Sequence, residues 1–214
     1  IVICSAATLT AILATIIEIL QTFIVLSSRY THKHFIVIKQ LENCSISDHP
    51  IRFSKLESRF RVLDLSENDL VGTSIQSLSL ALTNSFLPHL QSLNLSRNAK
   101  IGVEAEILME AICESVGKGS SCIDSLDLSQ TKCTIRGVEI ALARSNIKHL
   151  RFFDNNLGSP GFEALSIRGG HPFVETLDLG GNRADQSAVV KLLSGLLDED
   201  TDFESTLHSM VVGG

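Results

Sequence analysis

The sequence predicts an α/β solenoid, a horseshoe in which short parallel strands form a concave sheet and helices cover the convex side. Three observations predict it. A short phrase with apolar residues at fixed positions recurs along the 214-residue chain. The segments between copies have the apolar periodicity of helices. The copies also follow one another at similar distances, as in a repeat architecture.

The recurring phrase has the pattern L-x-x-L-x-L-x-x-N, which is the signature of a leucine-rich repeat. Alternating apolar residues predict a short strand in each copy, because strand side chains point to opposite faces in turn. A weaker copy at 36–44 and a shortened copy at 207–214 bring the expected repeats to about seven. The clear copies are FRVLDLSEN (60–68), LQSLNLSRN (90–98), IDSLDLSQT (123–131), IKHLRFFDN (147–155) and VETLDLGGN (174–182).

The spacing of the copies predicts a full helix in each repeat, because shorter repeats have room only for extended segments. The steps between third apolar positions are 24, 30, 33, 24, 27 and 33 residues, with a mean of 28.5. Strands and helices therefore alternate, with right-handed crossovers. The third apolar positions are Leu41, Leu65, Leu95, Leu128, Phe152, Leu179 and Val212.

Amphipathic helices are expected between the phrases from their 3.6-residue apolar period. After the second clear phrase, one apolar face should hold Val103, Ile107, Leu108, Ala111 and Ile112. After the fifth, it should hold Ala188, Val189, Leu192, Leu193, Leu196 and Leu197. Near the expected helix starts the chain must turn off the strand, and we expect backbone angles that favour glycine at Gly72, Gly102, Gly137 and Gly161.

We expect residues 1–214 to form a single leucine-rich repeat domain that is a fragment of a longer protein, since the chain lacks an initial Met and polar capping repeats. Residues 1–35 are interpreted as the apolar helix of a preceding repeat. A membrane helix over 1–26 is the alternative, because only Glu18 is charged there. The buried helix is favoured, since polar residues such as Thr8 and Gln21 suit a lipid-facing helix poorly.

The amino-acid composition indicates which class of partner and which cellular compartment to expect. The formal net charge of −6 disfavours nucleic acid, because phosphate binding needs a basic surface. The five cysteines are an odd number without a C-x-x-C pair, which favours a reducing cytoplasm over a disulfide-capped extracellular domain. A protein partner is therefore expected, in the cytoplasm.

Motifs for catalysis are absent from the sequence. It contains no phosphate-binding loop, G-x-S-x-G or H-E-x-x-H motif, so we expect neither enzyme activity nor a cofactor. The basic cluster of His32, Lys33 and His34 has no carboxylate or cysteine at ligand spacing, so no metal site is expected.

The residues between the apolar anchors of each strand should face the concave side. Arginine and aromatic residues are common interface anchors, so Arg151 and Phe153 should be the centre of a binding surface. The alternative is that Phe153 packs on neighbouring strands and Arg151 pairs with carboxylates of adjacent repeats. The candidate partner-binding residues are Asp64, Asn94, Asp127, His149, Arg151, Phe153 and Asp178.

The last position of the phrase predicts a structural ladder inside the solenoid. An asparagine there should turn inward and hydrogen bond to the backbone of the neighbouring repeat, since buried polar backbone groups need partners. The expected ladder comprises Asn68, Asn98, Asn155 and Asn182.

The phrases and helices over 36–212 resemble ribonuclease-inhibitor-type leucine-rich repeats. The segments QLENCSI, LDLSEND, LNLSRN and SLDLSQTKC, with unequal repeat lengths, are most similar to the leucine-rich repeat domain of the CARMIL family. This resemblance implies a cytoplasmic actin-regulatory scaffold, whose segments outside the repeats bind capping protein and class one myosins. The alternatives are a sensor domain of an innate immune nucleotide-binding receptor and a GTPase-activating repeat protein that uses Arg97 or Arg151.

Overall fold

The computed structural model describes residues 35–37, 61–85, 87–117, 122–166, 173–196 and 207–213. The chain divides into two compact units, residues 1–35 and residues 36–214. The expected apolar helix within 1–35, its membrane alternative and the cluster at His32 lie outside the described residues. Among the helices of the described ranges, none is long and apolar enough to cross a membrane.

The strands form one seven-stranded sheet in chain order. All registered pairs from β2 to β7 are parallel, and Leu63, Leu93, Leu126, Leu150, Leu177 and Met210 lie in register. In β2 to β6 the middle side chain is buried and its neighbours are not, which is the alternation predicted for these phrases. The strands are β1 (Phe35–Val37), β2 (Val62–Asp64), β3 (Ser92–Asn94), β4 (Ser125–Asp127), β5 (His149–Arg151), β6 (Thr176–Asp178) and β7 (Ser209–Val211).

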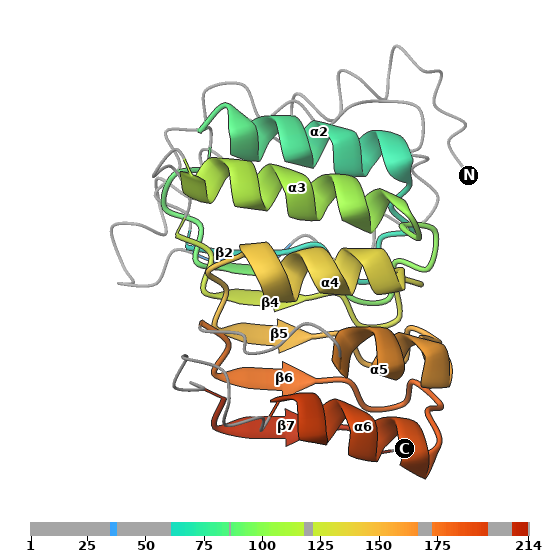
Figure 1. The fold of residues 1–214 in the computed structure, drawn as a ribbon. Coiled ribbons are helices and arrows are strands. Elements are labelled where there is room, and N and C mark those ends of the chain that lie inside the picture. Colours follow the sequence, from blue (N-terminus) through green and yellow to red (C-terminus); the bar gives the residue numbers. More distant parts are fainter. Residues whose placement is uncertain are drawn as a thin grey trace, which may run out of the picture. The chain divides into compact units, whose positions relative to one another are not determined.

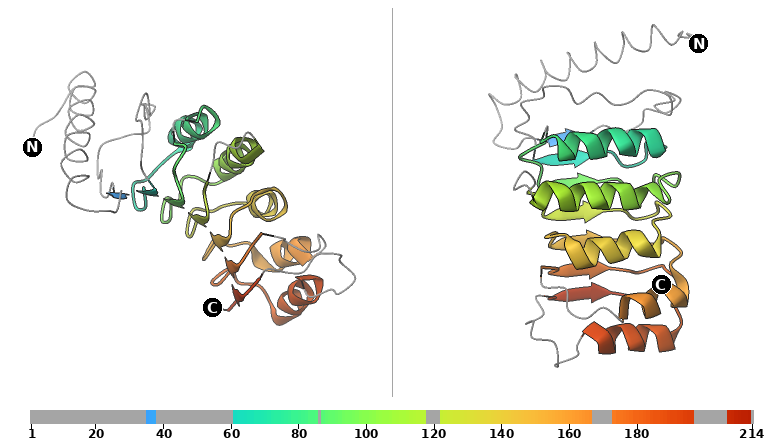
Figure 2. Two further views of the ribbon diagram at one scale, coloured as in Figure 1. Left: turned by 90° about the vertical axis from the view of Figure 1, so that its left-hand side faces the viewer. Right: turned by 45° about the horizontal axis from the view of Figure 1, so that its top comes forward.

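Five described helices connect successive strands from β2 to β7 and lie side by side on one face of the sheet (Figures 1 and 2). The core lies between the two layers, where Phe152 and Phe162 are fully buried. The predicted α/β solenoid of leucine-rich repeats is therefore confirmed. The helices are α2 (Gly72–Thr83), α3 (Glu104–Gly117), α4 (Ile135–Arg144), α5 (Gly158–Ser166) and α6 (Gln186–Leu196).

The apolar face of α3 differs from the face predicted for it. Leu108 and Ile112 are fully buried, but Ile107 is 45% exposed and Val103, just before the helix, is 64% exposed. The buried stripe is instead completed by Ala105 and Met109, at the i, i+3, i+4, i+7 positions of one helix face. In α6, Ala188 and Leu192 are buried as predicted, whereas Val189 and Leu193 are only half-buried. The burial of Leu196 and Leu197 lies outside the described residues.

Three of the four glycines near the helix starts, Gly72, Gly137 and Gly161, do not have the special backbone angle predicted for them. Gly102 has a φ of +51°, where glycine is favoured. Gly137 and Gly161 lie inside α4 and α5, and a Cβ there would come within 2.8 Å of Cys133 Sγ or 2.9 Å of Leu157 Cβ. These two positions require glycine because the chain that enters the helix passes close to it, and not because of a special backbone angle.

Candidate functional site

The sheet face opposite the helices, here called the open face, carries one central position per strand. Strand register aligns these positions across six repeats. Four of them are Asp or Asn, so the row is acidic and polar until Arg151 interrupts it. The central row reads Asp64, Asn94, Asp127, Arg151, Asp178 and Val211.

The Asp and Asn side chains of the central row terminate their own strands. In each case the Oδ1 atom accepts a hydrogen bond from the backbone N–H two residues later. The distances are 3.0 Å from Ser66 to Asp64, 3.0 Å from Ser96 to Asn94, 2.9 Å from Ser129 to Asp127 and 3.0 Å from Gly180 to Asp178. Such turns hold each side chain in one orientation, so the second oxygen of Asp127 and of Asp178 is left for other contacts.

Arg151 forms ion pairs with the second carboxylate oxygens of Asp127 and Asp178. Its Nη1 lies 3.2 Å from Asp127 Oδ2 and its Nε lies 3.5 Å from Asp178 Oδ2, so the guanidinium group is held between two neighbouring repeats. The Arg151 side chain is nevertheless 59% exposed, whereas those of Asp127 and Asp178 are 17% and 20% exposed. The carboxylates therefore orient the arginine and leave much of it accessible.

Phe153 follows β5 and lies over the next repeat. A Cβ at Gly180 would be 3.2 Å from Phe153 Cδ2, and one at Gly181 would be 3.1 Å from Phe153 Cε2. The ring therefore rests against backbone that carries no side chains, and Phe153 stays 38% exposed. A large apolar group is thus held on the open face close in sequence to Arg151.

The remaining candidate residues divide into two groups. His149 lies on β5 with Arg151, and its Nδ1 is 3.1 Å from Thr176 Oγ1 on β6. The structure therefore brings His149, Arg151 and Phe153 together with Asp127 and Asp178. Asp64 and Asn94 lie on β2 and β3, beyond the strand that carries Asp127.

Both contacts of the packing alternative are present, since Arg151 pairs with two carboxylates and Phe153 covers the following repeat. They do not bury either side chain, and a pre-oriented side chain that is still exposed can also contact a partner. Arg97, the other arginine considered for GTPase activation, pairs with Glu67 through its Nη1 at 2.6 Å.

The asparagines at the end of the phrase lie inside the solenoid and connect successive repeats. Asn98 Oδ1 accepts the backbone N–H groups of Asn68 at 3.0 Å and Leu70 at 2.9 Å, and its Nδ2 donates to Leu65 O at 2.9 Å. All three partners belong to the preceding repeat. Asn182 Oδ1 likewise accepts from Asn155 at 2.8 Å. These bonds satisfy buried backbone groups that the turn would otherwise leave unpaired.

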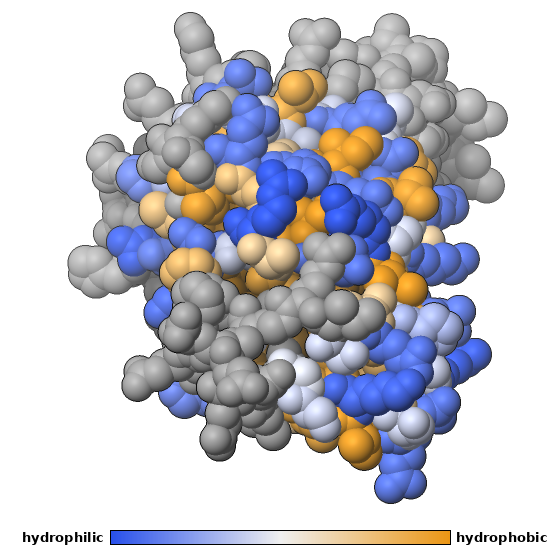
Figure 3. Space-filling model, viewed as in Figure 1, coloured by the Kyte–Doolittle hydropathy of each residue, from blue (hydrophilic) through white to orange (hydrophobic). Residues whose placement is uncertain are grey.

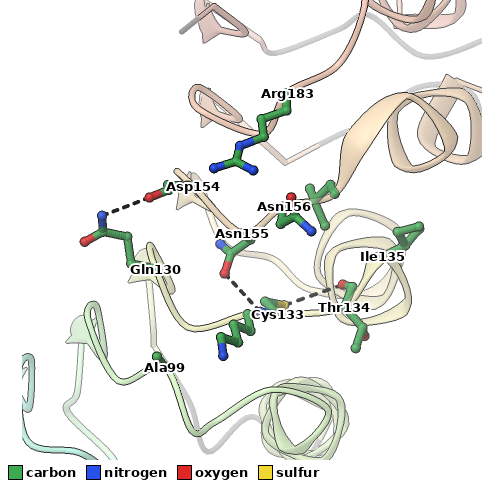
Figure 4. A pocket seen from close by; sticks show the side chains of 11 residues that line it. Ala99, Gln130, Cys133, Thr134, Ile135, Asp154, Asn155, Asn156 and Arg183 are labelled. Atoms are coloured by element: carbon green, nitrogen blue, oxygen red, sulfur yellow. Dashed lines mark hydrogen bonds between the residues drawn. The ribbon is translucent and has the colours of Figure 1, made fainter.

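Asn155 shows the same arrangement at the rim of a cavity of about 750 Å³ that is formed by the loops after β4, β5 and β6 (Figure 4). Its Oδ1 accepts from the backbone N–H groups of Thr131 at 3.1 Å and Cys133 at 2.9 Å. Burial raises the pKa of the Cys133 thiol to about 12, so this thiol stays protonated at neutral pH and is a poor nucleophile. Within the described ranges, no group of three or more His, Cys, Asp or Glu residues could hold a metal ion.

The sequence reasoning did not identify Gly180 and Gly181 as part of this surface. Their signal is visible in the last clear phrase, VETLDLGGN, where glycine stands at the position of Ser66, Ser96 and Ser129 in earlier copies. That position pairs across the sheet with Phe153, so the large ring and the missing side chains are complementary.

Comparison with known families supports the repeat assignment. The family model described as Leucine Rich repeat matches residues 86–105 and 145–166. No curated protein matches the chain. The first matched segment includes β3 and the start of α3, and the second includes β5 and all of α5. Together with the parallel sheet, these matches support a leucine-rich repeat fold for the chain.

Proposed function

We propose that this chain is a protein-binding scaffold whose partner contacts the open face around Arg151 and Phe153. Leucine-rich repeats generally mediate contacts between proteins, and solenoids present extended surfaces for them. The observation that carries the proposal is that a 59% exposed arginine and a 38% exposed phenylalanine lie close together, next to the carboxylates of Asp127 and Asp178 and the backbone of Gly180 and Gly181.

Pre-organisation supports this choice of anchors. Arg151 is held by two carboxylates and Phe153 by a glycine backbone, so neither side chain loses much rotamer freedom when a partner binds. A partner carboxylate can share the guanidinium group, while an apolar partner group covers the exposed side of the ring. Arginine and aromatic residues commonly dominate the binding energy of interfaces.

The wider role that we propose is regulation of actin assembly from the cytoplasm. Its support is the similarity of the repeat phrases to the CARMIL family. A pyrene-actin assembly assay with the full-length protein is the direct test. Filament growth in the presence of capping protein should change when the protein is added, and an unchanged time course would count against the actin role.

The scaffold proposal is tested by alanine substitution in the full-length protein with the partner that it recovers from cells. Phe153→Ala and Arg151→Ala should each reduce affinity by about 2 kcal/mol, roughly thirtyfold, when measured at a temperature at which both variants are folded. Val190→Ala is the matched control, because Val190 is 54% exposed but lies on α6. Equal affinity of the wild type and Phe153→Ala, with a loss for Val190→Ala, would move the site to the helices.

A further inference from the structure

A second surface lies on the opposite side of the repeats, between α2 and α3. It is a groove of about 720 Å³ lined by residues of both helices, with Ile140 of α4 at one edge. From this groove we infer a separate docking site, one that binds a basic amphipathic helix of a partner protein. It shares no residue with the open face.

The groove has an apolar centre. Leu80 of α2 is 62% exposed and Ile107 of α3 is 45% exposed, whereas Leu78 and Leu108 on the same two helices are buried. Ala111 and Ile140, which also line the groove, are 6% and 3% exposed. Figure 3 shows hydrophobic residues lying between hydrophilic ones over these helices. Two exposed aliphatic side chains above a buried apolar floor can receive the apolar stripe of a helix.

The negative charge of the groove favours a partner helix that carries basic residues. Glu106, Glu110 and Glu114 line it at successive helical turns of α3, and no described residue of the lining is basic. Residues four apart stand about 6 Å apart along a helix, so the three carboxylates form a line about 12 Å long. A helix with Lys or Arg beside its apolar stripe would match this line, whereas an acidic helix would be repelled.

Glu106 and Glu110 remain available to such a partner. Glu110 pairs with Arg144 at 2.6 Å, but their side chains are 45% and 54% exposed, and ion pairs this exposed contribute little. Glu106 accepts a hydrogen bond from the Thr134 hydroxyl at 2.6 Å, and this partner carries no positive charge. A partner cation can therefore join or replace these contacts at low cost.

Ser79 provides an independent indication that the groove is incomplete. It lines the groove, is 5% exposed, and its Oγ has no hydrogen-bond partner among the described residues. A buried hydroxyl without a partner is unfavourable, and a polar group at the edge of a docked helix would satisfy it.

Neither a second copy nor a membrane suits this surface as well. The described helices carry three basic residues, Arg136 and Arg144 on α4 and Lys191 on α6, so no described helix offers a basic row to match the three glutamates of α3. The chain has a formal net charge of −6, so two copies repel each other. Anionic lipid attracts basic surfaces, and the lining is acidic.

The test measures binding of a labelled helical peptide of leucine and lysine to the whole chain by fluorescence anisotropy. The peptide has about 18 residues, enough to form a helix, with leucines at i, i+3, i+4 and i+7. Ile107→Ala and Leu80→Ala should each weaken binding about tenfold. The double variant Glu110→Gln/Glu114→Gln should weaken it and flatten its dependence on salt.

Matched controls separate this site from the rest of the surface. Val190→Ala removes an equally exposed aliphatic group of α6, and Glu163→Gln removes a carboxylate whose ion pair, to Lys191, is also 2.6 Å long. Both should leave peptide affinity unchanged, as should Phe153→Ala, which tests only the open face. Binding of a leucine and glutamate peptide with equal affinity, or equal losses for Val190→Ala and Ile107→Ala, would overturn the inference. Self-association of the wild type, or binding to phosphatidylserine vesicles, that Ile107→Ala abolishes would overturn it as well.

Discussion

Phe153 of one repeat lies directly on Gly181 of the next. A Cβ at Gly181 would lie 3.1 Å from Phe153 Cε2, and Gly181 also has a φ of +70°. Glycine is therefore required at position 181 for two reasons: its positive φ disfavours other residues, and the Phe153 ring leaves no space for a side chain. This contact makes the exposed ring of the open face part of the packing between two repeats.

Gly181→Ala should destabilise the chain by roughly 1 kcal/mol more than a substitution that tests the backbone angle alone. Gly102→Ala is that matched substitution, because Gly102 has a φ of +51° and nothing lies within 4 Å of its added Cβ. Urea unfolding of both variants measures the difference. Adding Phe153→Ala should remove it, since the ring no longer opposes the methyl group. Equal losses for both glycines would show that the ring moves aside freely.

Asn155→Ala should reduce the free energy of unfolding by about 1 to 3 kcal/mol, because it leaves buried N–H groups of Thr131 and Cys133 without an acceptor. Thermal unfolding is a sufficient measurement. The control is Asn146→Ala, in the exposed loop before β5. If the two variants melted alike, the hydrogen bonds between repeats would contribute nothing measurable.

Thr131 occupies the ladder position in its repeat, and its hydroxyl donates to Leu128 O of the same repeat at 2.7 Å. A hydroxyl has one donor, whereas an amide has two donors and an acceptor. Thr131→Asn should therefore add bonds to the preceding repeat and stabilise the chain by about 1 kcal/mol, because the two side chains have similar volumes. A lower melting temperature would show that this repeat has adapted to the shorter side chain.

Arg151→Glu should destabilise the chain by about 1 kcal/mol at low salt, since it places a third carboxylate between Asp127 and Asp178. Added salt should restore part of the loss by screening. Lys191→Glu is a milder counterpart, because Lys191 faces Glu163. A loss independent of salt would indicate a packing effect and not charge repulsion.

The buried thiol of Cys133 should make the free energy of unfolding depend on pH in the alkaline range. Burial raises its pKa from 9.0 to about 12 in the folded chain, so unfolding above pH 9 releases a proton. The stabilisation is complete below pH 9 and is lost as the pH rises towards 12. Urea titrations should therefore show the advantage of the wild type over Cys133→Ala shrinking across this range. Cys122→Ala, which removes an exposed thiol, is the control variant for the substitution itself.

The strands and the sheet could be predicted because the apolar pattern that specifies each strand lies within one short phrase of the sequence. Leu63, Leu93 and Leu126 each stand at the same place in a short phrase, and a period of two leaves one face for them. The positions of Asn98 and Asn182 follow from the same phrase. Which backbone groups these amides bond could not be read from it, because the acceptors lie one repeat away.

Contacts between repeats were harder to predict. Ile107 belongs to an apolar run that is compatible with two helix faces, and only packing against α2 and α4 decides which one is buried. Gly137 near a helix start suggests a special backbone angle, yet its requirement comes from the sulfur of Cys133. Phe153 and Gly181 are 28 positions apart, and their complementarity appears only once the register of β5 and β6 is known.

Asn98, Asn155 and Asn182 of the ladder each bond to the repeat that precedes them in the chain, and this order has a consequence during synthesis of the protein. Asn98 completes the turn of the repeat before it, and Asn182 completes the turn that contains Asn155. Each turn is therefore finished by residues that leave the ribosome about one repeat later. The newest turn of the growing chain therefore lacks these hydrogen-bond partners until the next repeat has been synthesised.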